Sequence, residues 1–233
     1  MNAIIMAAGF GSRMVPVTLE TPKPLVSVNG LRFIDTLIQA FLGKGIHEIY
    51  VIRGYKKEMF NQLLERYPMI KFIDNDEYDK GNNILSIEKA LPYLNDSFLA
   101  EADLFLTNPD LIDVDAKKSY YLARPVLETD DWCFDKNNGY LTNYRKGGKN
   151  CYMACGLSYW TKQDCEKIKK DLTEALKNTK NKDIFWEFIP FVNNVEDFHV
   201  EGKDYQQSDI VEIDSFRELC EIDTSYKNYH GAK

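Results

Sequence analysis

The sequence predicts an α/β fold built on a mostly parallel mixed sheet with helices on both faces. Strand-like and helix-like segments alternate through residues 1–110, which is typical of such sheets. The pattern changes over residues 119–160, where short β-like runs are separated by Asn-Asn-Gly and Gly-Gly turns. We therefore expect a small antiparallel β insertion in the second half of the chain.

Apolar periodicity and glycine or proline stops define the individual elements. The expected strands cover residues 3–7, 47–53, 70–74, 97–106 and 210–213, and the β-like runs cover 120–126, 139–144 and 151–160. The expected helices cover residues 33–42, 57–67, 83–94, 162–178 and 216–222. The tail from Ser225 is expected to be frayed.

Composition limits the classes of protein that this chain can represent. With 233 residues, of which 44% are hydrophobic, the chain can bury a core as a single domain over 1–233. No apolar run approaches the ~20 residues that span a bilayer, so we expect no membrane partner. A net charge of -7 makes nucleic-acid binding unfavourable. Five cysteines without zinc-site spacing predict reduced thiols and a cytoplasmic protein.

A glycine-rich turn follows the first expected strand and reads Ala7, Ala8, Gly9, Phe10, Gly11, Ser12 and Arg13. Backbone N–H groups in such a turn can approach phosphate oxygens, and the start of a following helix would help. Arg13 would add a guanidinium group for phosphate. The motif is neither a dinucleotide fingerprint, because Met14 replaces the third glycine, nor a Walker A loop. A strand-to-helix turn without a ligand is the alternative.

Lys23 lies between Pro22 and Pro24, ten residues after Arg13. The prolines restrict the backbone, and Pro24 disfavours the helical region for Lys23. We expect a stiff, extended segment that directs the ammonium group toward a phosphate. A solvated loop lysine is the alternative.

Carboxylates are expected at two strand ends. Asp103 falls at the end of a central strand, where ligands of open α/β sheets bind. Glu212 and Asp214 alternate on a short strand, so both side chains point to one face. Oxygen ligands of this kind suit Mg²⁺. Exposed carboxylates at strand ends are the alternative.

Asn82, Asn83 and Ser86 form a polar group at the start of an expected helix. Asparagine offers both a donor and an acceptor, which is what reading a pyrimidine edge requires. A helix N-cap at Asn82 or Asn83 explains the same residues equally well.

The combination AAGxGSR…TPKPL resembles the signature of the nucleotidyltransferase family that includes sugar-1-phosphate pyrophosphorylases and bacterial choline-phosphate cytidylyltransferases. The resemblance implies a Rossmann-like (GT-A-like) fold, with residues 1–110 binding the nucleotide and about 111–233 binding the acceptor. It implies that the glycine loop, Arg13 and Lys23 bind a triphosphate, which in the choline-phosphate branch is that of CTP. It also implies that Asp103 and Asp214 hold Mg²⁺.

The chain is most similar in pattern to the branch that activates phosphocholine or 2-aminoethylphosphonate. Trp132, Phe185 and Trp186 resemble positions of a choline-binding aromatic cage. The neighbouring carboxylates Asp131, Asp183 and Glu187 would favour a cationic head group, and Glu212 is a further residue expected to bind the acceptor. Phe185 departs from the tyrosine common there, and Asp-Asp-Trp-Cys resembles the aminoethylphosphonate enzymes. The two acceptors stay equal at this point, with phosphoethanolamine third. A sugar-1-phosphate nucleotidyltransferase and a non-catalytic homologue remain alternatives, and the oligomeric state stays open.

Overall fold

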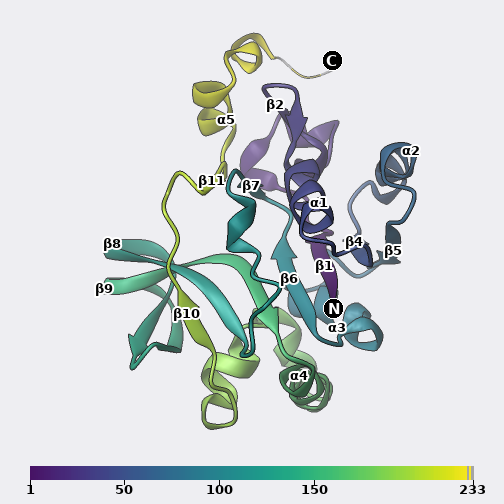
Figure 1. Ribbon diagram of the computed structural model, residues 1–233. Coiled ribbons are helices and arrows are strands. Elements are labelled where there is room, and N and C mark those ends of the chain that lie inside the picture. Colours follow the sequence, from purple (N-terminus) through teal and green to yellow (C-terminus); the bar gives the residue numbers. More distant parts are fainter. Residues whose placement is uncertain (230, 232–233) are drawn as a thin grey trace.

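The computed structural model describes residues 1–229 and 231, and its centre is a seven-stranded sheet (Figure 1). The strands are β1 (Asn2–Ala7), β4 (Ile49–Arg53), β5 (Lys71–Asp74), β6 (Ser97–Glu101), β8 (Tyr120–Asn137), β9 (Tyr140–Trp160) and β10 (Glu201–Lys203). Their order is β10-β8-β9-β6-β1-β4-β5. Strands β5, β4, β1 and β6 run parallel, whereas β9 pairs antiparallel with both β6 and β8. The predicted α/β class with a mixed sheet is confirmed.

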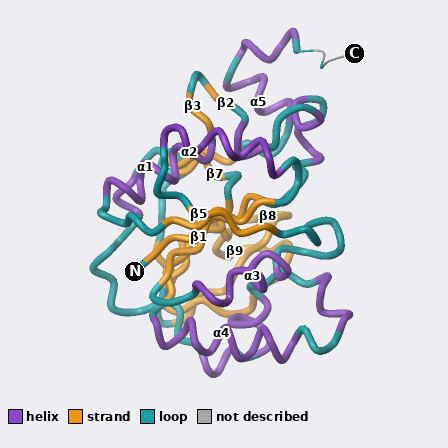
Figure 2. Tube along the Cα trace, turned by 90° about the vertical axis from the view of Figure 1, so that its right-hand side faces the viewer, coloured by secondary structure: helices purple, strands orange, loops and turns teal. Residues whose placement is uncertain are grey.

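Helices cover both faces of this sheet (Figure 2). One face carries α1 (Phe33–Gly43) and α2 (Leu63–Arg66), and the other carries α3 (Ile84–Ala90) and α4 (Lys162–Ala175). Alternate side chains of β1 explain the two cores, because Ala3 and Ile5 join the first and Ile4 joins the second. The sheet contains strands from both halves of the chain, and the proposed division near residue 110 stays a prediction.

The strand expected over 97–106 is two strands in two different sheets. β6 ends at Glu101, and β7 (Leu104–Leu106) pairs antiparallel with β11 (Ile210–Glu212). The backbone N–H of Ala102 still donates to the Met6 carbonyl, at 3.0 Å, before the chain leaves β1. This break places Asp103 between the sheets, beside the segment that carries Asp214.

Two helices are shorter than expected. The helix predicted over 57–67 is a 3-10 helix, Lys57–Gln62, followed by α2. The helix predicted over 83–94 leaves α geometry after Ala90, because Pro92 cannot continue an α-helix. Helices α1 and α4 end within a few residues of their predicted ends, and α5 (Phe216–Ile222) has the predicted bounds.

The tail is ordered where the structure describes it, which corrects the expectation of fraying. Residues Thr224–Asn228 form a 3-10 helix, and the Tyr226 hydroxyl donates to the Ser27 carbonyl in β2 (Ser27–Val28) at 2.8 Å. β2 pairs with β3 (Leu31–Arg32). Residues 230 and 232–233 of the predicted tail lie outside the described residues.

Strands β8 and β9 replace the three short runs expected over 120–160. They form one long, strongly bent ribbon, in which Cys133 pairs with both Arg145 and Met153. Asn138 and Gly139 both have positive φ at the connecting turn, as the Asn-Asn-Gly sequence predicts. The bend brings Trp132 back over the main sheet. None of the helices in the described part of the chain has the length and apolar character needed to cross a bilayer.

Candidate active site

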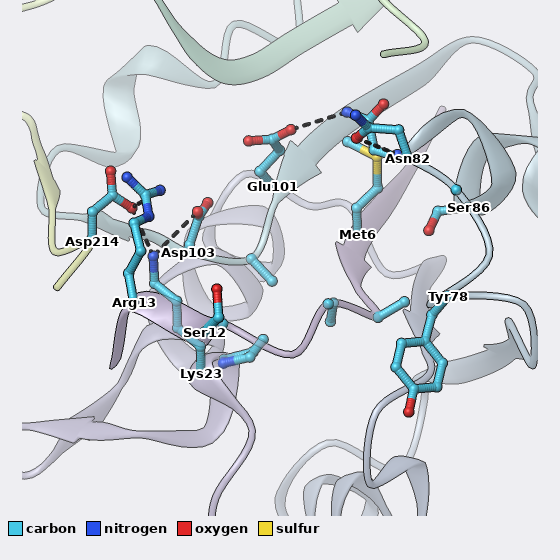
Figure 3. A pocket seen from close by; sticks show the side chains of 18 residues that line it. Met6, Ser12, Arg13, Lys23, Tyr78, Asn82, Ser86, Glu101, Asp103 and Asp214 are labelled. Carbon is cyan, nitrogen blue, oxygen red and sulfur yellow. Dashed lines mark hydrogen bonds and ion pairs between the residues drawn. The ribbon is translucent and has the colours of Figure 1, made fainter. Parts of the chain in front are cut away.

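A cavity of about 410 Å³ opens above the carboxyl end of β1 (Figure 3). Every residue expected to bind the nucleotide lines it: Ala7, Ala8, Gly9, Gly11, Ser12, Arg13, Asn82, Asn83 and Ser86. Tyr78, Gly81 and Lys23 complete much of the wall. We call this cavity the nucleotide pocket. The residues that the sequence predicts to bind the nucleotide are thus far apart along the chain but line one cavity.

The glycine loop turns sharply at Gly11, whose φ is +70°. A Cβ there would lie 3.0 Å from the Cβ of Lys23, so glycine is required both for conformation and for space. The expected helix after the loop is only a 3-10 turn over Ser12–Met14. Pro16 disfavours helical geometry at the preceding residue, and Val15 is extended with ψ of 134°. No helix N-terminus therefore faces this cavity from the loop.

Lys23 connects the loop to the carboxylates. It is 7% exposed, and its Nζ lies 2.9 Å from Asp214 Oδ1 and 3.2 Å from Asp103 Oδ2. Burial alone would lower the pKa of Lys23, but the charges of the two aspartates outweigh it and raise that pKa. The segment is not extended as expected, because Lys23–Leu25 form a 3-10 turn. Pro24 fits at the start of this turn, where the backbone N–H that proline lacks would have no partner within the turn. The surface-lysine alternative is wrong.

Arg13 joins the same cluster, with an amino nitrogen 3.1 Å from Asp214 Oδ1. Asp214 is fixed from behind, because its backbone N–H donates to the Glu218 carboxylate at 2.8 Å. Glu218 belongs to the capping box that Ser215 forms at the start of α5. The short α5 thus positions the carboxylate that contacts both cations.

Asp103 and Asp214 have the character of a Mg²⁺ site. Asp103 Oδ1 is buried and finds no hydrogen-bond partner among the described residues. The other oxygen shares Lys23 with Asp214, so the two carboxylates already face one cation position. Mg²⁺ commonly takes one or two carboxylates and fills the rest of its shell with water and substrate phosphate. No cluster of three metal-ligating side chains occurs within residues 1–229 and 231.

The three polar residues at α3 lie in the nucleotide pocket, but their side chains are occupied by protein partners. Asn83 Oδ1 accepts from the backbone N–H of Trp186 at 2.8 Å, and Ser86 Oγ accepts from the side-chain amide of Asn75 at 3.1 Å. Asn82 Oδ1 accepts from the Asn83 N–H at 2.8 Å. Asn83 is the N-cap residue of α3 but makes no side-chain capping bond. Asn83 is therefore neither a side-chain cap of α3 nor an amide without protein partners that is free to contact a base.

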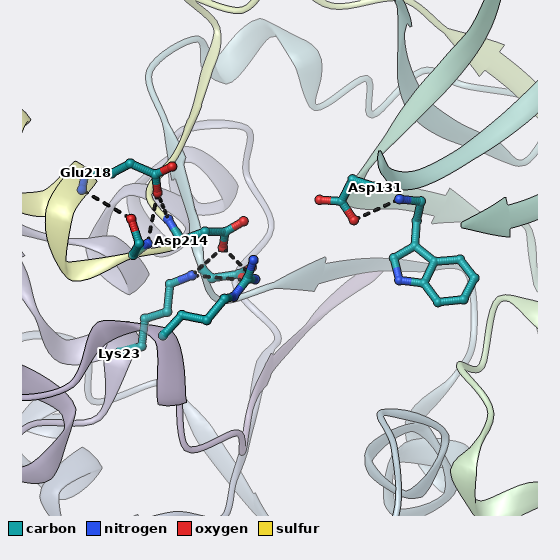
Figure 4. Close-up of polar contacts among 8 residues, drawn as sticks. Lys23, Asp131, Asp214 and Glu218 are labelled. Atoms are coloured by element: carbon teal, nitrogen blue, oxygen red, sulfur yellow. Dashed lines mark hydrogen bonds and ion pairs between the residues drawn. The ribbon is translucent and has the colours of Figure 1, made fainter. Parts of the chain in front are cut away.

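A second cavity, of about 440 Å³, lies between the β8–β9 ribbon and the carboxylates. The residues expected to bind the acceptor that line it are Asp131, Trp132, Phe185 and Glu212. Figure 4 shows Asp131 facing Lys23 and Asp214 across this space. We call this cavity the acceptor pocket.

Trp186 does not line the acceptor pocket, and its prediction as an acceptor-binding residue is wrong. It is 1% exposed and packs against Trp160, with ring centroids 5.4 Å apart. Its neighbour Glu187 lines the pocket instead. Burial of the larger apolar ring in the core explains which of the two side chains turns inward.

The aromatic side of the pocket is already partly filled. Trp132 stacks on Tyr144 at 4.8 Å with an interplanar angle of 14°, and Phe185 lies 4.6 Å from the same indole. One face of Trp132 is therefore covered by protein. This arrangement leaves less ring surface for a ligand than the sequence suggested.

Carboxylates form the opposite side. Burial raises the pKa of Glu187 to about 7 and, with help from Asp214 and Asp103, that of Glu212 to about 7. Burial, together with Asp103 and Glu187, raises the pKa of Glu101 well above its ordinary value. Burial in this pocket therefore disfavours the charged forms of these three carboxyl groups.

Several pocket residues carried no assigned role at the level of sequence: Tyr78, Glu101, Tyr121, Tyr144 and Lys146. Glu101 is two residues before Asp103, a spacing that indicates a shared face, and this signal was available. Lys146 comes from β9, and nothing in its local sequence distinguishes it from other lysines of the ribbon. Long-range folding alone brings these residues together.

The two pockets share four lining residues, namely Arg13, Glu101, Asp103 and Asp214. A ligand in each pocket would therefore meet at the cluster that contains both cations and both candidate metal ligands. The arrangement suits transfer of a group between two bound molecules.

The family described as nucleotidyl transferase matches residues 2–131. The chain belongs to this family. It is 38% identical over 230 residues to a 2-aminoethylphosphonate cytidylyltransferase of Lancefieldella rimae, covering 97% of this chain and 93% of that protein. It is 29% identical over 229 residues to a choline-phosphate cytidylyltransferase of Streptococcus pneumoniae, covering 98% and 99% of the two proteins.

Solved structures of nucleotidyl transferases agree with this assignment. A structure of the CTP:phosphocholine cytidylyltransferase of Streptococcus pneumoniae matches with a TM-score of 0.87 and 29% identity, over 96% of this chain and 98% of that one. An inositol-1-phosphate CTP transferase from T. maritima matches with a TM-score of 0.71 and 18% identity, over 100% and 98%, and shows likeness of fold. The predicted family and its cytidylyltransferase branch are confirmed.

Proposed function

We propose that this nucleotidyl transferase moves CMP from CTP to a small cationic phosphate or phosphonate, with Mg²⁺, and releases pyrophosphate. The observation that supports the proposal most strongly is the Lys23–Asp103–Asp214 cluster at the junction of the two pockets. CTP would occupy the nucleotide pocket and the acceptor would occupy the second one. Similarity to named cytidylyltransferases supports both the nucleotide and the acceptor class.

The reaction would be an in-line attack of an acceptor oxygen on the α-phosphorus of CTP. The attacking oxygen is already anionic, so no side chain has to remove a proton. Catalysis would come from positioning and from neutralising charge at the phosphorus. Lys23, which is buried and held in place, would face the α-phosphate and the acceptor. The more exposed Arg13 would hold the departing pyrophosphate.

Asp103 and Asp214 would hold Mg²⁺, which supplies charge neutralisation between the two reacting groups. In the absence of ligands both aspartates contact Lys23. Their negative charges therefore keep the ammonium group at the junction, and Glu218 keeps Asp214 oriented.

2-Aminoethylphosphonate is the first acceptor candidate and phosphocholine the second. The relative that acts on the phosphonate is more similar to this chain, at 38% identity compared with 29%. A sugar phosphate is disfavoured because aromatic rings and carboxylates line the acceptor pocket, where a sugar would need several hydroxyl-binding groups. A non-catalytic role is disfavoured because Arg13, Lys23, Asp103 and Asp214 meet in one cluster.

Pyrophosphate release tests the proposal directly. The protein would be assayed with CTP and Mg²⁺ against 2-aminoethylphosphonate, phosphocholine and glucose-1-phosphate, with UTP replacing CTP as the nucleotide control. We expect turnover with a cationic acceptor and CTP. Turnover with the sugar phosphate alone would move the protein to the sugar branch, and no release with any acceptor would contradict the proposal.

A further inference from the structure

Two carboxylates from distant parts of the chain contact the amide of Asn83, which lines the nucleotide pocket next to the acceptor pocket. Asn83 Nδ2 lies 3.3 Å from Glu101 Oε1 and 3.3 Å from Glu187 Oε2. Glu101 ends β6, and Glu187 follows the core residue Trp186. Tyr121 adds a hydroxyl contact to Glu187 at 3.4 Å. We call Glu101 and Glu187 the carboxylate pair.

Asn83 is held in this bridging position from its other end. Its Oδ1 accepts from the backbone N–H of Trp186 at 2.8 Å, the shortest of the three hydrogen bonds of the Asn83 side chain. The amide nitrogen is thereby directed toward the carboxylate pair. Figure 3 shows Glu101 between Asp103 and Asn82 along the nucleotide pocket.

The carboxylate pair has no cationic partner of its own. Within the described residues no lysine or arginine forms an ion pair with Glu101 or Glu187, whereas Asp103 and Asp214 both pair with Lys23. Glu187 is 1% exposed, so water cannot replace that partner fully. When they are ionised, two buried carboxylates that share long hydrogen bonds to one neutral amide lack a compensating positive charge. A cationic ligand in the acceptor pocket would complete them.

The type of cation follows from the donors and the ring surfaces. A primary ammonium has three N–H donors for two carboxylates, whereas a quaternary ammonium has none and relies on ring faces. Tyr144 already covers one face of Trp132, and Phe185 packs on the same ring. The pocket is therefore better equipped for hydrogen bonds to a charged amine than for a cage around methyl groups.

We propose that the carboxylate pair is the receptor for a primary ammonium group of the acceptor, and that Asn83 is the positioning residue that holds this receptor together. The inference rests on the proposed function, because it concerns the acceptor of the same reaction. It assigns Asn83 to acceptor selection, where the sequence suggested reading of the base.

The first test uses the unaltered protein, so that no variant has to fold. The substrates are 2-aminoethylphosphonate and its N-methyl, N,N-dimethyl and N,N,N-trimethyl derivatives, with CTP and Mg²⁺ constant. We expect kcat/KM to fall with each methyl group that removes a donor, by about tenfold to a hundredfold over the series. Equal or higher kcat/KM for the trimethyl compound would overturn the inference. Absence of pyrophosphate with the whole series would instead count against the proposed function.

The second test separates the two roles of Asn83. In Asn83→Ala and Glu187→Gln we expect KM for 2-aminoethylphosphonate to rise about tenfold or more, with KM for CTP changed less than about twofold. The preference for the primary amine over its trimethyl derivative should shrink by a similar factor. Glu166→Gln, on the exposed face of α4, is the matched control and should leave all constants unchanged.

Two other outcomes of the second test would contradict the inference. A rise in KM for CTP, or weaker discrimination between CTP and UTP, at unchanged acceptor KM would make Asn83 a base-reading residue. Unchanged constants in both variants would remove the carboxylate pair from acceptor binding. Circular dichroism would verify the fold, and Asn83→Ser, which keeps one small polar group, would replace Asn83→Ala if that variant did not fold.

Discussion

The nucleotide pocket and the acceptor pocket are built in different ways. The wall of the first comes largely from a continuous stretch at the N-terminus, residues 7–24, with a second short stretch at 81–86. The wall of the second comes from β6, the β8–β9 ribbon, the segment at 185–187 and the end of β11. One pocket is thus mainly a local structure, whereas the other depends on the packing of the whole chain.

The two pockets also differ in how their carboxylates are paired. The carboxylates beside the nucleotide pocket, Asp103 and Asp214, are paired with Lys23 and Arg13. Among the described residues the carboxylate pair has hydrogen bonds with the neutral Asn83 and Tyr121 and no ion pair. The carboxylates of the first pocket are thus compensated by the chain itself, whereas we propose that a cationic ligand compensates those of the second. Variants on either side should therefore fail in different ways.

The largest effect is expected for Lys23→Ala. Loss of the ammonium group removes charge neutralisation from the phosphorus under attack, so kcat should fall by about a thousandfold or more. Steady-state pyrophosphate release measures this, with circular dichroism to verify the fold. Arg217→Ala is the control, because Arg217 is exposed and forms an ion pair with Glu221 one helical turn away, outside both pockets. Retention of more than about a tenth of the activity would show that Lys23 does not act at the reacting group.

Asp103→Asn is expected to rank second and to alter the metal requirement. The amide keeps the size of the side chain but loses a charge, so kcat should fall by about a hundredfold and the half-saturating Mg²⁺ concentration should rise. Chelation with EDTA should abolish the activity of the unaltered protein, and added Mg²⁺ should restore it. Activity that survives EDTA would exclude the metal from the mechanism.

The contrast between the pockets also explains what could be predicted from sequence. The glycine loop, Lys23 and the turn at Asn138-Gly139 follow from local chemistry and were placed correctly. The contact between Asn83 and Glu187 joins residues 104 positions apart, and no local pattern encodes it. Spacing alone also could not decide between Trp186 and Glu187, since either could face the pocket. Burial of the larger ring against Trp160 decided it.

Local geometry was less predictable where proline acted through tertiary context. Pro16 shortens the turn after the glycine loop, and Pro24 fits inside a 3-10 turn where an extended segment was expected. In both places the backbone differs from the prediction, while the side chains of Arg13 and Lys23 line the cavity where they were expected. A residue type can therefore be assigned to a pocket from its motif while its precise approach to the ligand depends on the fold.

A smaller effect should appear in the stability of the ligand-free protein. The pKa of Glu187 rises from 4.5 to about 7 on folding, so the folded state holds its proton more tightly than the unfolded state. The resulting stability is fully present below about pH 4.5 and is lost as pH rises to about 7, up to about 3 kcal/mol. Urea unfolding at several pH values, comparing the unaltered protein with Glu187→Gln, measures it.

The difference between the two proteins isolates Glu187, because other titrating groups such as Glu212 contribute to both. We expect the free energy of unfolding to decline less between pH 4.5 and 7 in Glu187→Gln than in the unaltered protein. Parallel curves would show that Glu187 is ionised in the ligand-free protein or that its charge is compensated by a group other than Asn83 and Tyr121.

The smallest effect is expected for Gly156→Ala. Comparison with Gly139→Ala separates the cost of a positive φ from displacement of a pocket residue. Gly156 has φ of +81°, and a Cβ there would lie 2.9 Å from the Glu101 carboxylate. Gly139 has φ of +87° with nothing within 4 Å of its Cβ position. Both alanine variants should lose about 1–2 kcal/mol from the positive φ. Only Gly156→Ala should also raise KM for the acceptor several-fold, because it displaces one member of the carboxylate pair. Equal acceptor KM in the two variants would mean that the position of Glu101 does not matter for acceptor binding.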